Sequence, residues 1–248
     1  MNRFTQMAWL IRGVMIEVLR RQMLWILFLV MGGYALVSLA VRQQGMDGVG
    51  AASFMLNLGL YMAGMLAQLL TALLALRQFP SEMENRTIYP LLAKPLDREV
   101  LVLGKWLACS LGGWLVYVMF FLLAWLCAPK VENLSGGLLM QLLMIQPLLL
   151  AWVSAFSLAV SLCFPRGVSH AMVIFMLFCG DAICQWGAEK WPVFNALPRF
   201  GSVDLATRFT DGIGAVPWGE SLWMFAYVCL WIVLSLDVAR RLFVRRAL

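Results

Sequence analysis

Residues Ala51–Leu76 read AASFMLNLGLYMAGMLAQLLTALLAL and contain no Asp, Glu, Lys or Arg. A helix needs roughly 20 apolar residues to cross the hydrocarbon core of a bilayer. Backbone N–H and C=O groups in lipid must find partners within the protein, so an apolar stretch of this length predicts a membrane-spanning helix. The stretch therefore places the chain among integral membrane proteins.

Five further apolar stretches of similar length predict five more spanning helices: Met23–Val41, Trp106–Ala128, Leu138–Phe164, Val168–Trp186 and Trp218–Leu236. The chain of 248 residues is 62% hydrophobic and 13% charged, whereas soluble domains are roughly 45–50% apolar and about 25% charged. The polar residues are too few to cover a water-soluble globule, which excludes a soluble enzyme, a disordered chain and a nucleic-acid-binding domain. We predict an all-α polytopic membrane protein with six transmembrane helices, forming one transmembrane domain over residues 1–248.

Residues 1–22 precede the first span and predict an amphipathic helix. Apolar residues recur at helical spacing, and most of the basic residues fall on the other side of the helix. Such a helix lies in the membrane interface; the alternative is a plain cytosolic leader. The first span is expected to remain as an uncleaved anchor, because it is longer than the roughly 7–15 apolar residues of a signal peptide.

The distribution of Lys and Arg predicts the orientation in the membrane. Six spans bring both termini to one side, which then holds 14 of the 19 Lys and Arg residues, against 5 on the other side. Loops rich in Lys and Arg stay in the cytoplasm. Both termini are therefore expected in the cytoplasm.

The cytoplasmic segment 77–105 reads RQFPSEMENRTIYPLLAKPLDREVLVLGK. Ser81 is a suitable N-cap for a short helix, because the acidic residues Glu82 and Glu84 would then lie in its first turn. Pro90 and Pro95 should break the segment into short pieces. A short charged helix of this kind is suited to docking on a partner, and a solvated connector is the alternative.

Three runs in this segment form a recognisable pattern: Glu82–Ile88 (EMENRTI), Leu91–Arg98 (LLAKPLDR) and Leu103–Lys105 (LGK). The pattern resembles the signature of membrane permeases of ABC transporters of the type-2, exporter-like family. Those chains carry E-x-E-x-x-T-[IL] after the second span, then L-L-x-x-P-[LIV]-x-R, and a G-K that opens the third span. The motif covers 24 residues, and the six-span layout with its amphipathic start extends the resemblance along most of the chain. Tyr89-Pro90 departs from the family pattern and would shorten the helix in this segment.

The resemblance implies a function and a set of partners. Family members pair into a permease dimer, with a second copy or a paralogue, over separate cytoplasmic ATPase subunits in the bacterial cytoplasmic (inner) membrane. The expected function is ATP-driven transport, in the export direction, with ATP and Mg²⁺ bound by the ATPase and no cofactor on this chain. The chain itself is not expected to be an enzyme, because it lacks the G-x-x-x-x-G-K-[ST] phosphate loop. The alternative is a membrane scaffold that anchors or regulates an ATPase without transporting.

The resemblance also implies roles for individual residues. The residues expected to couple the permease to the ATPase are Glu82, Glu84, Thr87, Pro95 and Arg98. Gly104 is expected to allow close packing where the third span enters the membrane. Lys105 is expected to extend its ammonium group to the lipid headgroups.

The substrate pathway is expected at the dimer interface. Its neutral polar candidates are Asn57, Gln68, Gln141 and Gln146. Asp181 is the one acid well inside a predicted span, where a carboxylate is a functional candidate by default, although it is close enough to Trp186 to reach the outer interface. Desolvating a highly charged molecule beside such residues is costly, which favours an amphipathic or lipid-like cargo.

The outer segment 187–217 predicts a short re-entrant helix before the last span, with an ordinary loop as the alternative. No metal site is expected. The single histidine, His170, excludes multi-histidine cages, and the six cysteines include no C-x-x-C pair, so they are expected to act as small buried apolar residues.

Overall fold

The computed structural model describes residues 3–19, 23–43, 49–84, 98–127, 136–190, 200 and 215–246. These residues form helices joined by a few short turns. The helices are α1 (Arg3–Leu19), α2 (Met23–Gln43), α3 (Val49–Glu84), α5 (Arg98–Cys127), α6 (Gly136–Cys163), α7 (Arg166–Lys190) and α9 (Trp218–Arg246). The prediction of an all-α membrane protein is therefore confirmed for the described part of the chain.

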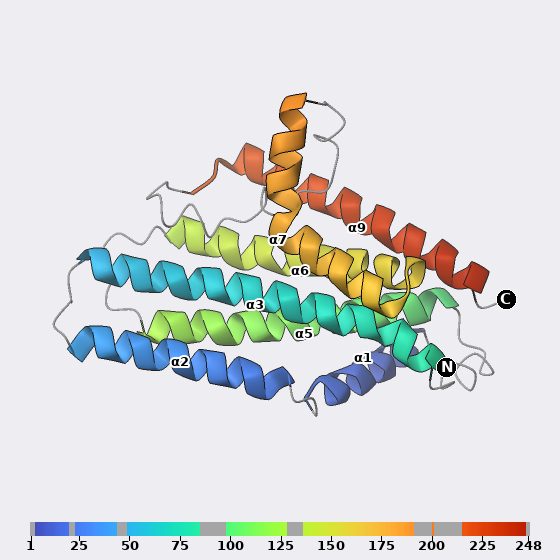
Figure 1. Ribbon diagram of the computed structural model, residues 1–248, viewed down its shortest axis with the longest axis horizontal. Helices are drawn as coiled ribbons and strands as arrows, with labels where there is room; N and C mark the ends of the chain where they lie inside the picture. The colour runs from blue at the N-terminus through green and yellow to red at the C-terminus, as the bar shows by residue number, and fades with distance from the viewer. Residues whose placement is uncertain are drawn as a thin grey trace.

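Helices α3, α5 and α6 form the centre of the bundle, with α2 and α9 alongside them (Figure 1). The three central helices are the most buried of the apolar helices, because each packs against several others. Two hydrogen bonds join α5 to α6. The Trp106 indole donates to the carbonyl oxygen of Ala151 at 2.8 Å, and the Ser154 hydroxyl donates to the carbonyl oxygen of Trp106 at 3.2 Å.

An aromatic cluster joins α6 to α9. The fully buried Trp152 of α6 packs against Tyr227 and Trp231 of α9, with ring centroids 5.8 Å and 6.3 Å away. Phe200, from the segment between α7 and α9, covers the same indole at 4.4 Å. Large aromatic side chains contribute much of the energy of a packed core, so this cluster fixes α9 on α6.

Small residues allow the helices to approach closely. A Cβ atom at Gly113 of α5 would lie 1.7 Å from the Thr71 hydroxyl oxygen on α3. A Cβ atom at Gly59 of α3 would lie 2.5 Å from the Tyr34 hydroxyl oxygen on α2. That hydroxyl donates to the carbonyl oxygen of Met55 at 2.9 Å, so α2 is held against α3 by a bond that only a glycine at position 59 permits.

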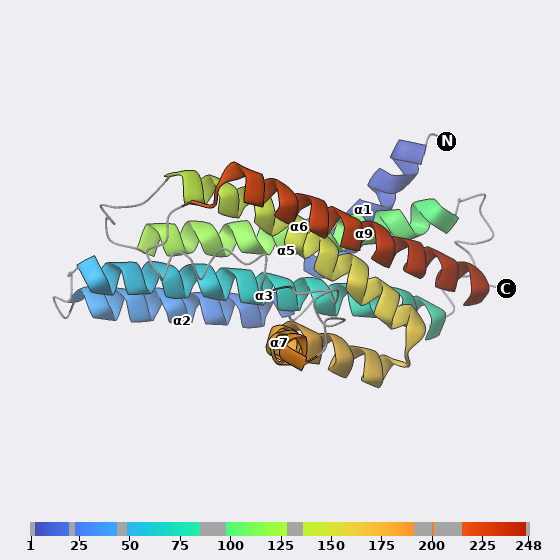
Figure 2. The same ribbon diagram turned by 90° about the horizontal axis from the view of Figure 1, so that it is seen from above.

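The two termini lie at the same end of the bundle, together with the end of α3 and the start of α5 (Figure 1). This arrangement fits the predicted position of both termini on one side of the membrane. Helix α7 lies to one side of the other helices and changes direction along its length (Figures 1 and 2).

The helices extend beyond the predicted apolar limits. Helix α3 continues eight residues past Leu76, and α9 continues ten residues past Leu236. Among the described residues five helices are long and apolar enough to span a membrane, and they are α3, α5, α6, α7 and α9. The remaining predicted span, Met23–Val41, corresponds to α2, whose described apolar part, Leu27–Val41, is shorter than that length.

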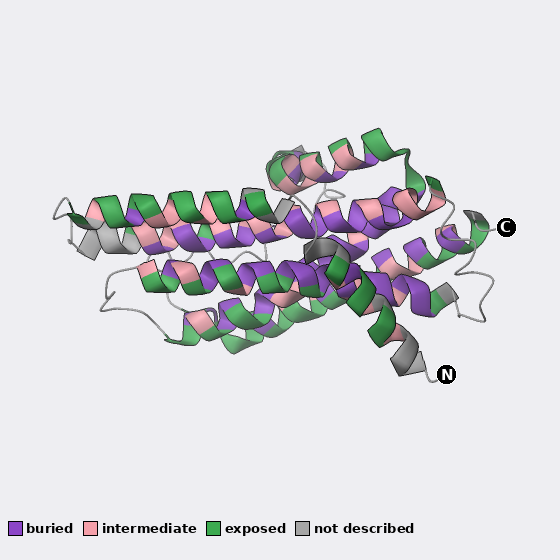
Figure 3. Cartoon of the chain, turned by 90° about the horizontal axis from the view of Figure 1, so that it is seen from below, coloured by how far each residue is buried: buried purple, intermediate pink, exposed green. Residues whose placement is uncertain are grey.

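Helix α1 corresponds to the predicted amphipathic helix. Val14 is buried and Ile11 packs against the core, while Trp9 and Ile16 are exposed. The buried side faces α5, so α1 is attached to the bundle as well as being amphipathic. Figure 3 shows the exposed residues along α1 and along the outer side of α2.

Candidate functional site

The candidate site lies where α3 ends and α5 begins, on either side of residues 85–97. Glu82 and Glu84 occupy the last turn of α3, and Gly104 and Lys105 lie in the second turn of α5. Thr87 and Pro95 lie outside the described residues, as do Pro90 and the side chain of Arg98. The structure therefore describes both ends of the predicted coupling segment.

The predicted helix start at Ser81 is wrong. Helix α3 runs without interruption from Val49 to Glu84 and includes Pro80. The Ser81 hydroxyl donates to the carbonyl oxygen of Arg77 at 2.6 Å, which is a bond inside a helix and not an N-cap. Proline has no N–H, so the helix lacks the bond from position 80 to the carbonyl oxygen of Leu76, one turn before its end.

Lys105 is buried at the junction of α3, α5 and α9. Its side chain is 2% exposed, and its ammonium group forms an ion pair with the Glu82 carboxylate and donates to the carbonyl oxygen of Gln78 at 3.4 Å. The same nitrogen lies 4.4 Å from the centroid of the Phe79 ring. Phe79 in turn packs on Phe243 of α9, with the ring centroids 5.0 Å apart.

These contacts correct the prediction that Lys105 extends to the lipid headgroups. A buried ammonium group is strongly unfavourable unless a carboxylate and further acceptors surround it. Glu82, Gln78 and Phe79 supply those groups, so the charge is retained inside the protein. Glu82 is only 25% exposed and is committed to this contact. Gly104, next to Lys105, is also buried.

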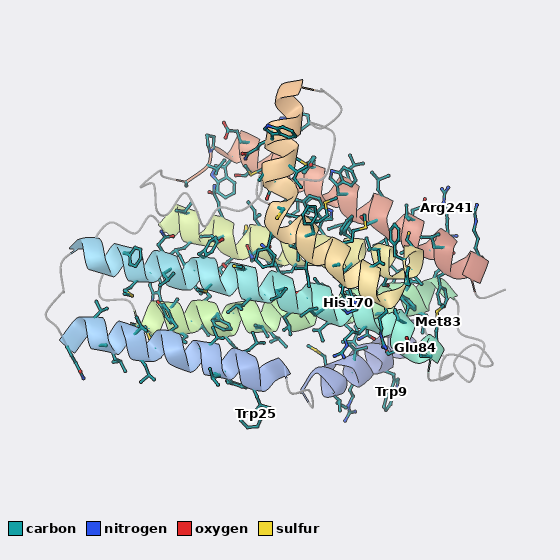
Figure 4. All side chains as sticks on the ribbon, in the orientation of Figure 1. Trp9, Trp25, Met83, Glu84, His170 and Arg241 are labelled. Carbon is teal, nitrogen blue, oxygen red and sulfur yellow. The ribbon has the colours of Figure 1, made fainter. Side chains whose placement is uncertain are left out.

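Glu84 makes a different kind of contact. The guanidinium of Arg166, the first residue of α7, donates to the Glu84 carboxylate at 2.5 Å, with the two side chains 41% and 56% exposed. His170, one turn further along α7, donates from Nδ1 to the carbonyl oxygen of Arg166 at 2.6 Å. Figure 4 shows Glu84 and Arg241 at the same end of the molecule, with His170 further along α7. Glu84 therefore connects the end of α3 to the start of α7.

A third ion pair follows the segment on its other side. Glu99 in the first turn of α5 pairs with Arg240 of α9 at 2.7 Å, and both side chains are about half exposed. Exposed pairs of this kind contribute roughly 0.2–1 kcal/mol each. Carboxylates at both ends of the 85–97 segment thus pair with cations on three helices: α5, α7 and α9.

Sequence reasoning missed the cationic partners Arg166 and Arg240 and the aromatic residue Phe79. The predicted orientation places both arginines on the same side of the membrane as Glu84 and Glu99. Opposite charges at the same depth on predicted helix ends were the available signal. The pairing itself depends on which helices are neighbours, and that is not visible in the sequence.

The predicted pathway residues do not gather at one place. The Gln141 side chain is buried and forms two hydrogen bonds with the backbone of Val216. Its amide nitrogen donates to the Val216 carbonyl oxygen at 2.7 Å, and its amide oxygen accepts from the Val216 N–H at 2.9 Å. Gln146 is buried within the chain, where a Cβ atom on Gly64 would lie 3.4 Å from its amide nitrogen. Asn57 and Gln68 on α3 and Asp181 on α7 are partly exposed. Gln141 and Gln146 therefore face the interior of one chain, while the other three can face a partner or the pathway.

A cavity of about 380 Å³ lies between α6 and α9, near the ends opposite the ion pairs. Its walls are almost entirely apolar and include Met144, Ile145, Leu222 and Phe225. Gln141 also lines the cavity, but its amide is already bonded to Val216. The cavity therefore suits an apolar group better than a polar one.

The predicted re-entrant helix of residues 187–217 lies mostly outside the described residues. Its described parts are the end of α7, Phe200 and residues 215–217, of which Phe200 and Val216 are buried. Within the described ranges no group of three His, Cys, Asp or Glu side chains could hold a metal ion. The six cysteines are free thiols; Cys109 and Cys184 are buried, whereas Cys163 and Cys229 are exposed.

Comparison with known protein families gives one result. A family model described as "ABC-2 family transporter protein" matches residues 15–184, which is more than half of the chain. The match begins within α1 and ends within α7, so it includes Glu82, Glu84, Lys105 and Arg166. No curated protein matches the chain.

Proposed function

Because the chain belongs to the ABC-2 family of transporter membrane proteins, we propose that it forms the substrate pathway of an ATP-driven exporter in the bacterial inner membrane. It is a multi-pass membrane component, and components of this family are typically non-catalytic. In this proposal two such chains, or one chain and a paralogue, stand over two cytoplasmic ATPase subunits. ATP and Mg²⁺ bind to the ATPase subunits, and this chain needs no cofactor.

One observation carries the proposal: the ion-paired end of the bundle. Both ends of the 85–97 segment, both termini and the ion pairs of Glu82, Glu84 and Glu99 lie at one end of an otherwise apolar bundle. A charged end whose ion pairs join four helices, α3, α5, α7 and α9, is suited to receiving force from a cytoplasmic partner. The segment itself, with Thr87, Pro95 and Arg98, is the proposed contact with the ATPase.

The proposed cargo is amphipathic or lipid-like. The apolar cavity between α6 and α9 supports a cargo with a hydrocarbon part, because its volume of about 380 Å³ lies in the range of small-molecule sites. Asn57, Gln68 and Asp181 remain the proposed polar contacts along the pathway. Two amides and one carboxylate are too few to replace the hydration of a multiply charged cargo.

The proposal is tested by co-purification and reconstitution. The chain is expressed together with a candidate ABC ATPase from the same genome, purified in detergent and placed in liposomes. We expect a stable complex whose ATP hydrolysis is stimulated by the chain. Arg98→Glu and Thr87→Lys should weaken the complex. Gln43→Lys should not, because Gln43 is the last residue of α2 and lies at the end of the bundle opposite the ion pairs.

Three results separate the possible outcomes. A chain that purifies without any ATPase and stimulates no hydrolysis contradicts the proposal. Hydrolysis that responds to the chain but not to lipids or other amphipathic compounds, with no transport, identifies a scaffold that anchors an ATPase. Lipid-stimulated hydrolysis with transfer of a labelled lipid between leaflets supports the exporter.

A further inference from the structure

Helix α7 is the least firmly attached of the long apolar helices at the ion-paired end. In its apolar part 22% of the residues are buried, compared with 50–67% in α3, α5 and α6. Helix α9 has the same low fraction, but the Trp152 cluster and the contact between Phe79 and Phe243 fix it at two points. Figure 2 shows α7 beside the layer formed by the other helices.

Helices α3, α5, α6 and α9 are joined by buried and partly buried contacts. The buried Lys105 of α5 pairs with Glu82 of α3 and lies over the Phe79 ring, which packs on α9. The Trp106 indole bonds α5 to α6. Breaking a buried contact of this kind leaves a desolvated charge or donor, so these four helices are expected to move together.

The contact between Glu84 and Arg166 differs in two respects. Both side chains are about half exposed, so water can replace the partner of each and the pair can open and close readily. Glu84 is also the last residue of α3 before the 85–97 segment, and Arg166 is the first residue of α7. The pair therefore joins the last residue of α3 to the first residue of α7, while Glu82, two residues earlier, is paired with Lys105 of α5.

We propose that Arg166 is a positioning residue for transport: the Glu84–Arg166 ion pair positions the start of α7 on the end of α3, and the Glu82–Lys105 pair holds α3 against α5. Helix α7 then moves against a body formed by α3, α5, α6 and α9. The proposal rests on the exporter function proposed above. It reassigns the two glutamates of the motif from contacts with the ATPase to contacts within the permease.

The test measures the position of α7 directly. In a variant whose six cysteines are replaced, spin labels are attached to the exposed positions Phe175 on α7 and Leu115 on α5, and their separation is measured by pulsed electron resonance in nanodiscs. Glu84→Arg and Arg166→Glu should each broaden or shift the distance distribution without nucleotide. The double variant, which restores opposite charges, should recover the wild-type distribution.

The same variants are then compared in the complex with the ATPase. Each single reversal should lower the transport rate per ATP hydrolysed by up to about fivefold, the most that an exposed ion pair usually contributes, and the double variant should recover it. Asp237→Arg is the matched control, because Asp237 and Arg241 form an exposed pair within α9 that joins no two helices. Asp237→Arg should change neither the distance distribution nor the transport rate per ATP hydrolysed.

The outcomes are distinguishable. Single reversals with wild-type distance distributions and wild-type transport overturn the inference. A double variant that recovers neither distance nor transport also overturns it, because the pairing itself is then not required. A wild-type chain with no ATPase and no nucleotide response contradicts the proposed function, and the distances measured without nucleotide still decide whether the ion pair positions α7.

Discussion

Lys105 shows how the environment decides the role of one residue. Next to Gly104 at the predicted start of a span, a lysine was expected to reach the headgroups, yet its ammonium group is enclosed by Glu82, Gln78 and Phe79. Replacing a buried ion pair with apolar residues is often neutral, whereas removing one member leaves an uncompensated charge. We therefore expect the removal of Lys105 alone to cost more stability than the removal of both members of the pair.

Lys105→Met is expected to destabilise the chain by about 3 kcal/mol or less, the lower end for a fully buried pair, because the Glu82 carboxylate loses its partner but is 25% exposed. The double variant Glu82→Met/Lys105→Met should recover most of this loss. Thermal unfolding in detergent, followed by circular dichroism, measures both. Asp237→Asn, in an exposed pair, serves as the control and should change the stability by less than about 1 kcal/mol. Equal losses in the single and double variants would contradict the role of the ion pair.

Gly113 and Gly112 provide a second comparison at the same scale. A Cβ atom at Gly113 would lie 1.7 Å from the Thr71 hydroxyl oxygen, whereas one at Gly112 would meet its nearest neighbour, Leu74, at an ordinary 3.5 Å. Gly113→Ala should lower the free energy of unfolding by about 1–3 kcal/mol, as overpacking does, and Gly112→Ala should be nearly neutral. Adding Thr71→Ala to Gly113→Ala should restore part of the loss. The same melting experiment would refute the close approach of α3 and α5 if the two glycine variants behaved alike.

At the scale of elements, Gln141 connects α6 to the start of α9. Gln141→Leu leaves the buried Val216 backbone groups without partners, and each such group costs about 1–3 kcal/mol. We expect a lower melting temperature. Gln68→Leu, on a partly exposed face of α3, should leave the melting temperature unchanged. A Gln141 variant with normal stability and reduced transport would instead support its predicted position on the pathway.

The packing of helix α1 on α5 can be tested in the same way. Val14 is buried against the bundle, whereas Ile16 is exposed. Val14→Asp places a carboxylate among apolar side chains and should release α1 from α5, since an unpaired buried polar group costs about 1–3 kcal/mol by mutational measurements. Hydrogen exchange at the α1 backbone should then rise. Ile16→Asp should weaken only the contact of α1 with lipid and leave hydrogen exchange at the α1 backbone unchanged. Faster exchange in both variants would argue against packing of α1 on α5.

The whole molecule has both termini at one end, which makes its orientation testable. Cysteines introduced into the variant without native cysteines should be labelled from outside the cell at Gln43 and from the cytoplasm at Glu84 and Arg245. The physical reason is the concentration of Lys and Arg at the terminal end. Labelling of Glu84 from outside would reverse the orientation and remove the 85–97 segment from any cytoplasmic ATPase.

The sequence by itself determined the class of the protein. Long uncharged stretches such as Ala51–Leu76 can satisfy their backbone only as helices in lipid, whatever their neighbours are. The motif from Glu82 to Lys105 indicated the family, and the family model confirms it. These conclusions depend on local composition and spacing, which a single chain displays in full.

Only the tertiary structure decided which charges meet. Glu82 and Glu84 are two residues apart, yet one is held by a buried lysine on α5 and the other by an exposed arginine on α7. Gln141 and Asn57 were equivalent as polar residues within spans, but Gln141 is bonded to Val216 inside the chain. An ion pair or a buried amide depends on the positions of residues from distant helices. The packing of those helices sets these positions, because it determines which side of each helix water, lipid or protein covers.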